Sequence, residues 1–98
     1  MSYKILDLTV KNHPGVMSHI TGLFSRRTFN LEGIVCFPLE DNKKSRMLLM
    51  INEEQQLQQI TSQLEKLYDV IDISVNDSAG KNPFIHMDEI ASGLIKQE

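Results

Sequence analysis

The chain has 98 residues, of which 41% are hydrophobic and 6% aromatic, and this length fits one small domain rather than an enzyme with its own cofactor domain. Thirteen acidic and ten basic residues give a net charge of −3. That balance argues against non-specific nucleic-acid binding, because such binding needs a basic surface.

The first part of the chain predicts a strand followed by a helix. Residues 3–10 alternate, so that Leu6, Leu8 and Val10 share one face of a strand. Asn and Pro then favour a turn, and a helix is expected over residues 14–28. Its apolar stripe consists of Val16, Ile20, Leu23 and Phe24.

A hairpin is predicted next. Residues 31–39 and 45–52 are apolar and flank a polar turn over residues 40–44. Pro38 cannot donate to a sheet ladder, which places the first of these strands at an edge. The nearly continuous apolar run of the second strand favours a central position.

The remaining pattern predicts a helix over residues 53–67 and a strand over residues 69–76. The helix repeats apolar residues at 3–4 spacing, at Leu57, Ile60, Leu64 and Leu67. In the strand, Ile71, Ile73 and Val75 are expected to share one face.

These elements make a βαββαβ unit of the ferredoxin-like α+β class. Two right-handed crossovers that share a hairpin give a four-stranded antiparallel sheet in the order 4-1-3-2, with both helices on one face. We assign residues 1–78 to this domain and residues 79–98 to a tail, in which residues 87–97 are expected to form a short amphipathic helix.

No catalytic or metal site is predicted. The three histidines lack the i, i+4 spacing of a helical metal site, and His19 is interpreted as a surface residue. Asp69 and Asp72 lie in different phases of their strand. Cys36 is interpreted as a small buried hydrophobe, with a reactive thiol as the alternative.

Nucleic acid and membrane are not expected partners. RNA-recognition motifs share this element order, but they need a basic, aromatic third strand, and residues 45–52 contain no aromatic side chain. The apolar stretches are too short to span a bilayer, and the first residues do not resemble a signal peptide. A single cysteine fits the reducing cytoplasm.

The turn over residues 12–17, NHPGVM, is the candidate binding site. It opens a helix, whose first backbone N–H groups have no partners within the helix and attract a carboxylate. Gly15 lets a ligand approach the backbone, and Asn12 offers a donor and an acceptor. This combination suits a free amino acid, although ordinary turn and helix-start chemistry explains the same residues.

Three segments carry a resemblance to a known family: LTVKNHPGVM (residues 8–17), GLFSRRTFNLEGI (residues 22–34) and LEKLYDV (residues 64–70). They resemble the ACT domain of the small regulatory subunit of acetohydroxyacid synthase (acetolactate synthase), and the similarity extends over residues 3–76. The short isozyme I type of small subunit is the most similar form. Longer members continue into a second domain, so the transmission of inhibition is expected to differ here.

The resemblance implies an effector site at the interface of two ACT domains, which pair side by side as a homodimer. The effector implied is valine, with Asn12 and Gly15 in the binding turn, backbone N–H groups from Val16 and Met17, and Asn30 reaching from the partner chain.

The resemblance also implies a second partner, the catalytic large subunit, which carries thiamine diphosphate, magnesium and FAD. None of these cofactors is expected in this chain, which would be a non-catalytic regulatory subunit in branched-chain amino acid biosynthesis. A free-standing ACT amino-acid sensor or dimerisation module with another client remains the alternative.

Overall fold

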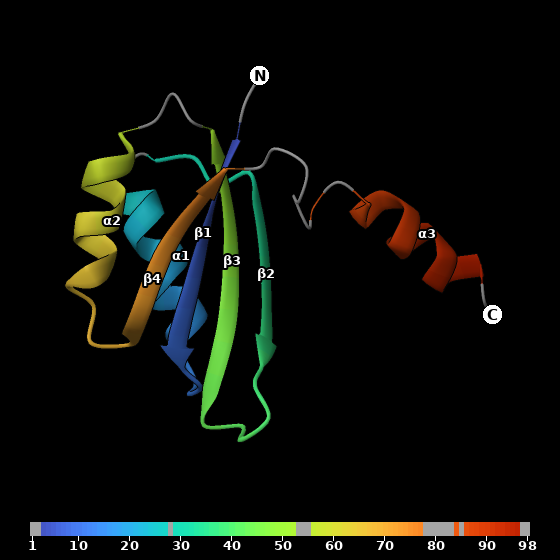
Figure 1. Ribbon diagram of the computed structural model, residues 1–98, viewed down its shortest axis with the longest axis horizontal. Helices are drawn as coiled ribbons and strands as arrows, with labels where there is room; N and C mark the ends of the chain where they lie inside the picture. Colours follow the sequence, from blue (N-terminus) through green and yellow to red (C-terminus); the bar gives the residue numbers. More distant parts are fainter. Residues whose placement is uncertain (1–2, 28, 53–55, 78–83, 85, 97–98) are drawn as a thin grey trace.

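The chain folds as a βαββαβ unit followed by a third helix (Figure 1). The structure is a computed structural model that describes residues 3–27, 29–52, 56–77, 84 and 86–96. The elements are β1 (Tyr3–Lys11), α1 (Val16–Arg26), β2 (Gly33–Pro38), β3 (Lys44–Asn52), α2 (Leu57–Glu65), β4 (Val70–Asp77) and α3 (Met87–Lys96). The predicted fold class is confirmed.

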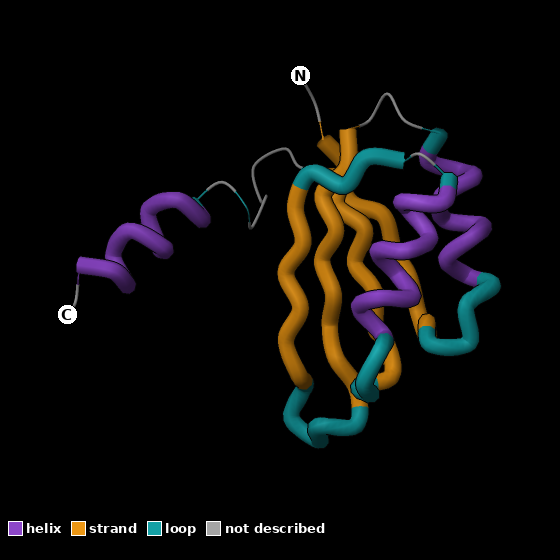
Figure 2. Tube along the Cα trace, turned by 180° about the vertical axis from the view of Figure 1, so that it is seen from behind, coloured by secondary structure: helices purple, strands orange, loops and turns teal. Residues whose placement is uncertain are grey.

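The four strands form one antiparallel sheet in the order β2-β3-β1-β4. This is the predicted 4-1-3-2 order, with β3 inside the sheet and β2, which ends at Pro38, at an edge. Helices α1 and α2 lie on the same face of the sheet, and Figure 2 shows them from their own side. We call the opposite sheet surface the open face.

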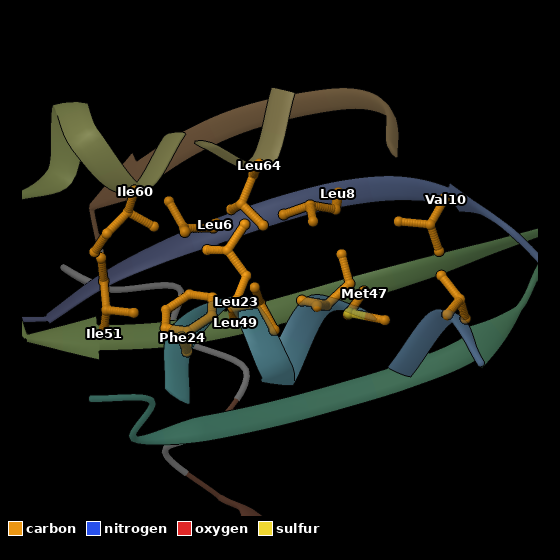
Figure 3. Close-up of a cluster of buried hydrophobic side chains, with 12 residues drawn as sticks. Leu6, Leu8, Val10, Leu23, Phe24, Met47, Leu49, Ile51, Ile60 and Leu64 are labelled. Atoms are coloured by element: carbon orange, nitrogen blue, oxygen red, sulfur yellow. The ribbon is translucent and has the colours of Figure 1, made fainter. Parts of the chain in front are cut away.

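The core lies between the sheet and these two helices (Figure 3). Leu6 and Leu8 of β1 are fully buried and pair with the buried Leu49 and Met47 of β3. The predicted apolar stripe of α1 is buried against them, and Ile60 and Leu64 come from α2. Each large side chain buried in this way contributes about 1.5–3 kcal/mol.

Both helices of the domain differ from their predicted bounds. Helix α1 begins at Val16, two residues later than predicted, because Gly15 takes the left-handed conformation with φ 92° and ends the turn. The predicted end at Thr28 and the predicted start of α2 at residue 53 lie outside the described residues. At the other end of α2, the N–H of Leu67 bonds to the carbonyl of Leu64, a tightened final turn.

Strand β4 contains a bulge that the sequence pattern did not predict. Thr9 pairs with Asp72, and the next residue, Val10, pairs with Val70. Ile71 is therefore the extra residue, 47% exposed, whereas Val70 packs against the core. The bulge interrupts the alternation between Ile71 and Ile73, so the pairing places only Ile73 and Val75, opposite the buried Leu8 and Leu6, on the predicted common face.

Cys36 is exposed rather than buried as predicted. It pairs with Met47 and so lies on the helix side of the sheet, but it belongs to an edge strand with a neighbour on one side only. Partial burial raises the pKa of the thiol, although its hydrogen bond with Ser45 acts in the opposite direction. The thiolate that a reactive cysteine needs is thus disfavoured.

The predicted tail helix is present as α3. It lies beyond the β2 edge of the sheet in both views (Figures 1 and 2). None of the helices in the described part of the chain has the length and apolar character needed to cross a membrane.

Candidate functional site

The turn between β1 and α1 presents backbone donors at the start of a helix. Gly15 is the N-cap residue, and no side chain caps the helix. The N–H of Val16 donates to the carbonyl of His13 at 3.3 Å, and the N–H of His19 donates to the carbonyl of Gly15 at 3.0 Å. Among the described residues, none accepts a hydrogen bond from the N–H of Gly15 or of Met17. These two donors remain for a ligand, at the positive end of the helix.

Asn12 fixes this turn to the loop between β2 and β3. Its side-chain Nδ2 donates to the carbonyl of Asn42 at 2.8 Å, and its backbone N–H donates to the carbonyl of Lys43 at 3.0 Å. Asn42 itself has a left-handed φ of 57°. The amide group of Asn12 is therefore held in place, which leaves its side-chain oxygen as an acceptor.

Two histidines converge on one buried carboxylate beside the turn. His13 Nε2 contacts one oxygen of Asp69, and His19 Nδ1 contacts the other. Asp69 is 1% exposed, whereas the side chains of His13 and His19 are 28% and 50% exposed. The carboxylate thus joins the turn over residues 12–17, helix α1 and the segment that leads into β4.

The geometry favours the protonated form of His13. Its Nδ1 contacts the carbonyl of Pro14 at 2.7 Å and its Nε2 contacts Asp69, so both partners are acceptors. Both ring nitrogens donate only in the cationic form. The hydrogen bond to Asp69 accordingly raises the pKa of His13 above its ordinary 6.5.

Asp69 is the anionic partner of this cation, and its pKa is lowered. Burial alone would raise the pKa of the carboxyl, but the hydrogen bonds from His19 and His13 outweigh burial and lower it below its ordinary 3.8. Around neutral pH the group is therefore an ionised, buried carboxylate. A buried charge of this kind is stable only when it is paired.

An aromatic side chain covers the outer side of His13. Tyr68 stacks on the imidazole with ring centroids 6.1 Å apart, and Lys11 Nζ lies 4.8 Å from the centroid of the Tyr68 ring. A pocket of about 240 Å³ lies beside the cluster and is lined by Ser18, His19, Arg26, Leu67, Tyr68 and Asp69. In the described part of the chain, no three His, Cys, Asp or Glu side chains lie close enough together to hold a metal ion.

Sequence reasoning missed this cluster. His19 is a surface residue as predicted, with its side chain 50% exposed, but its contact with the buried Asp69 is not predicted by the sequence pattern. Asp69 is separated from His13 by 56 residues and from His19 by 50. The three residues show no characteristic spacing in the sequence. They come together because the end of β1 lies beside the start of β4 in the folded chain.

Asn30 lies away from the other predicted ligand residues. It precedes β2, whose first residue, Gly33, pairs with Met50, and Met50 pairs with Ile5 near the start of β1. Asn12 follows the end of β1, at the opposite end of the sheet. Within one chain, Asn30 and Asn12 therefore do not form a common site.

Comparison with known proteins identifies the family. The family model described as the AHAS small subunit-like ACT domain matches residues 6–72. The chain belongs to this family. The ACT domain is the βαββαβ unit described above, and the resemblance predicted from the sequence is confirmed.

Relatives of this ACT domain include small subunits of acetolactate synthase. The chain is 54% identical over 74 residues to the isozyme 1 small subunit of Escherichia coli K12, which covers 76% of this chain and 77% of that protein. It is 39% identical over 72 residues to the isozyme 3 small subunit of the same organism, covering 72% of this chain and 44% of that protein.

Solved structures of ACT domains have the same fold as this chain. The acetolactate synthase small subunit from Thermotoga maritima superposes with a TM-score of 0.72 at 29% identity, covering 83% of this chain and 51% of that one. The ACT domain of GTP pyrophosphokinase from Chlorobium tepidum has a TM-score of 0.60 at 21% identity, which supports the fold alone. The chain thus spans about half of the Thermotoga protein.

Proposed function

We propose that this chain is the regulatory small subunit of acetolactate synthase, and that it binds valine and mediates feedback inhibition and activation of a catalytic subunit. The observation that carries the proposal is the 54% identity to an isozyme 1 small subunit over three quarters of both chains. In this role the chain itself holds no catalytic site and no cofactor. Thiamine diphosphate, magnesium and FAD would belong to the catalytic partner.

The turn supports an amino-acid effector. The N–H groups of Gly15 and Met17 suit the carboxylate, and no heavy atom beyond its chain neighbours lies within 4 Å of the position that a Gly15 Cβ would take. The oxygen of Asn12 suits the ammonium group. Because His13 is paired with the ionised Asp69, the attraction for the carboxylate comes from the N–H groups at the helix start.

The separation of Asn12 and Asn30 supports a site shared by two chains. Strand β2 is an edge strand with partly buried Ile34 and Val35 and an exposed Phe37. An apolar edge with unpaired backbone groups favours pairing with a strand of another chain. Antiparallel pairing of two β2 edges around a two-fold axis would bring the start of one β2 beside the end of the other. Asn30 of one protomer would then lie at the Asn12 end of its partner.

A complementation experiment tests the shared site. Asn12→Ala and Asn30→Ala are expected to weaken valine binding by about ten- to a hundredfold each, because a hydrogen bond to a charged group contributes about 1.5–3 kcal/mol. Refolding the two variants together yields heterodimers with one intact and one doubly altered site. Random mixing should therefore restore about a quarter of the wild-type binding sites in calorimetry, since half of the dimers carry one good site of two.

Asn76→Ala serves as the matched control, because Asn76 is an exposed asparagine on β4 that pairs with Ile5, away from the turn. Its affinity for valine should stay at the wild-type level. Urea titration of each variant checks that loss of the Asn12–Asn42 hydrogen bond has not unfolded the domain. Mixed variants that regain no binding would refute a site shared between two chains.

The proposed partner is tested separately. Co-purification with the catalytic large subunit, and valine-sensitive acetolactate synthesis by the complex, would support the regulatory role. Valine binding without capture of that subunit would favour the alternative, a free-standing ACT amino-acid sensor with another client. In either role we expect the chain to act in the cytoplasm.

A further inference from the structure

The open face of the sheet carries an apolar patch. Val35 pairs with Leu48, and Leu48 in turn pairs with Asp7, whose side chain points away from the core. Leu48 and Met50 alternate with the buried core residues of β3 and therefore lie on the open face. Phe37, at the end of β2, lies on the same face and is 39% exposed.

Phe84, which precedes α3, lies on this face at the start of β2. A Cβ added to Gly33 would lie 2.9 Å from Cε1 of Phe84 and 3.3 Å from Cε of Met50. Because Gly33 pairs with Met50, that Cβ would point to the open face. The ring of Phe84 thus rests on the open face, three residues before α3 begins at Met87.

Helix α3 itself covers no part of its own sheet. Beyond Phe84 the helix lies outside the β2 edge, and Figures 1 and 2 show this placement from opposite sides. Ile90, in the middle of α3, is 54% exposed. The chain therefore presents an apolar helix side and an apolar sheet face that do not meet within one protomer.

A second copy joins the two surfaces. This step rests on the β2-to-β2 dimer of the proposed function. In that dimer the open faces of the two sheets are continuous, and Gly33 of one protomer lies near the end of the other protomer's β2. Helix α3 follows Phe84 and lies beyond the β2 edge of its own sheet. In the dimer it would therefore lie over the open face of the partner, near the end of β2 that carries Phe37.

We propose that α3 of each protomer packs on the open face of the other, with Ile90 against Phe37. The charges agree with this arrangement. The first turn of α3 carries Asp88 and Glu89, and Glu89 contacts His86. The open face beside Phe37 carries the exposed Lys44, together with Arg46, which is paired with Asp7, so Asp88 and Lys44 are the charges expected to approach each other. The reciprocal exchange covers both apolar surfaces and ties the C-terminal helix of one chain to the sheet of its partner.

Disulfide trapping tests the contact in the full chain. In a Cys36→Ser background, which removes the single native thiol, Phe37→Cys and Ile90→Cys are combined in one chain and oxidised gently. We expect a covalent dimer, and mass spectrometry should find the peptide of residue 37 joined to that of residue 90. The matched control replaces Phe37→Cys by Val75→Cys, which is equally exposed at 41% but lies on β4, across the sheet.

A second measurement does not need a new disulfide. Ile90→Asp should raise the dimer dissociation constant about tenfold or more in sedimentation equilibrium. The reason is that burial of an isoleucine side chain in the interface contributes at least about a tenfold gain in affinity. Ser92→Asp adds the same charge about 200° around the helix and should leave the dimer constant near the wild-type value.

The outcomes separate this proposal from the function on which it rests. A wild-type chain that is monomeric at micromolar concentration would refute the β2 dimer itself. A wild-type dimer whose residues 37 and 90 join within one chain, or join no faster than residues 75 and 90, would overturn the exchange of α3 and leave the dimer standing. An inter-chain 37–90 bond together with selective weakening by Ile90→Asp would establish the exchange.

Discussion

The left-handed conformation of Gly15 predicts how substitutions in the turn over residues 12–17 will change stability. Gly15 has φ 92° and ψ −8°, and the space around the position of its missing Cβ is open for 4 Å. Gly15→Ala therefore causes no steric clash, and its entire cost is conformational. An L-residue in this region costs about 1–2 kcal/mol, partly offset by the stiffer unfolded chain, so we expect a net loss of about 1 kcal/mol.

Gly22→Ala is the matched control within the same helix. Gly22 lies in the interior of α1 without a positive φ, and an added Cβ would meet only Nη1 of Arg26, at 3.2 Å, the mobile end of a flexible side chain. Alanine is favoured over glycine in helix interiors by about 0.8–1.0 kcal/mol, so Gly22→Ala should be neutral or stabilising. Gly15→Asn provides a third point, because asparagine tolerates the left-handed region better than alanine does.

The assay is urea denaturation followed by circular dichroism, at one protein concentration for all variants, since self-association shifts apparent stability. A loss of about 1 kcal/mol corresponds to a fall in melting temperature of roughly 4–8 °C for a domain of this size. Gly15→Asn should lie between the wild type and Gly15→Ala. If Gly15→Ala proved as stable as Gly22→Ala, the turn would not need a left-handed residue and the reasoning would be wrong.

Three further predictions concern the core and the buried carboxylate. Leu8→Ala, at a fully buried position on β1, should lower the unfolding free energy by about 2–5 kcal/mol in urea titration, whereas Ile71→Ala, at the exposed bulge, should change it by less than about 0.5 kcal/mol. The pKa of His13 is raised, so its stabilisation is complete below the unfolded value of 6.5 and is lost as pH rises through the higher folded pKa. The urea midpoint should therefore fall as pH rises above 6.5, and fall less in His13→Gln. Because the pKa of Asp69 is lowered, its stabilisation is complete above 3.8 and is lost as pH falls through the lower folded pKa; this acid-induced loss should be absent in Asp69→Asn, and a variant that titrates like the wild type would contradict the pairing.

The sequence predicted the βαββαβ order and the sheet because their signals are local. The alternation of Leu6, Leu8 and Val10 depends only on residues of one strand, and all three are fully buried as expected. The edge position of β2 followed from Pro38, a single residue that lacks an N–H. Such features need no knowledge of the partner strand.

The errors arise where a neighbouring element decides the outcome. The bulge at Ile71 is a property of the pairing between β4 and β1, so alternation within β4 could not reveal it. Cys36 is exposed because its strand lacks an outer neighbour within one protomer. The predicted effector residues Asn12 and Asn30 remain a prediction, because their joint site requires a second chain.

The cluster around Asp69 connects the turn over residues 12–17 to β1, α1 and the start of β4. The carbonyl of Asp69 accepts the N–H of Lys11 at 2.9 Å, the last residue of β1, while its carboxylate holds His13 in the turn and His19 on α1. The next residue, Val70, starts β4 and donates to the carbonyl of Leu67, just after α2, at 3.0 Å. A ligand that moved the turn would therefore have to break a buried ionic contact or shift the junction of α2 and β4 with it. Breaking the His13 contact would leave His19 as the remaining partner of the buried carboxylate, whereas the second response keeps both contacts. We therefore expect a motion of the turn to be accompanied by a motion of the junction between α2 and β4.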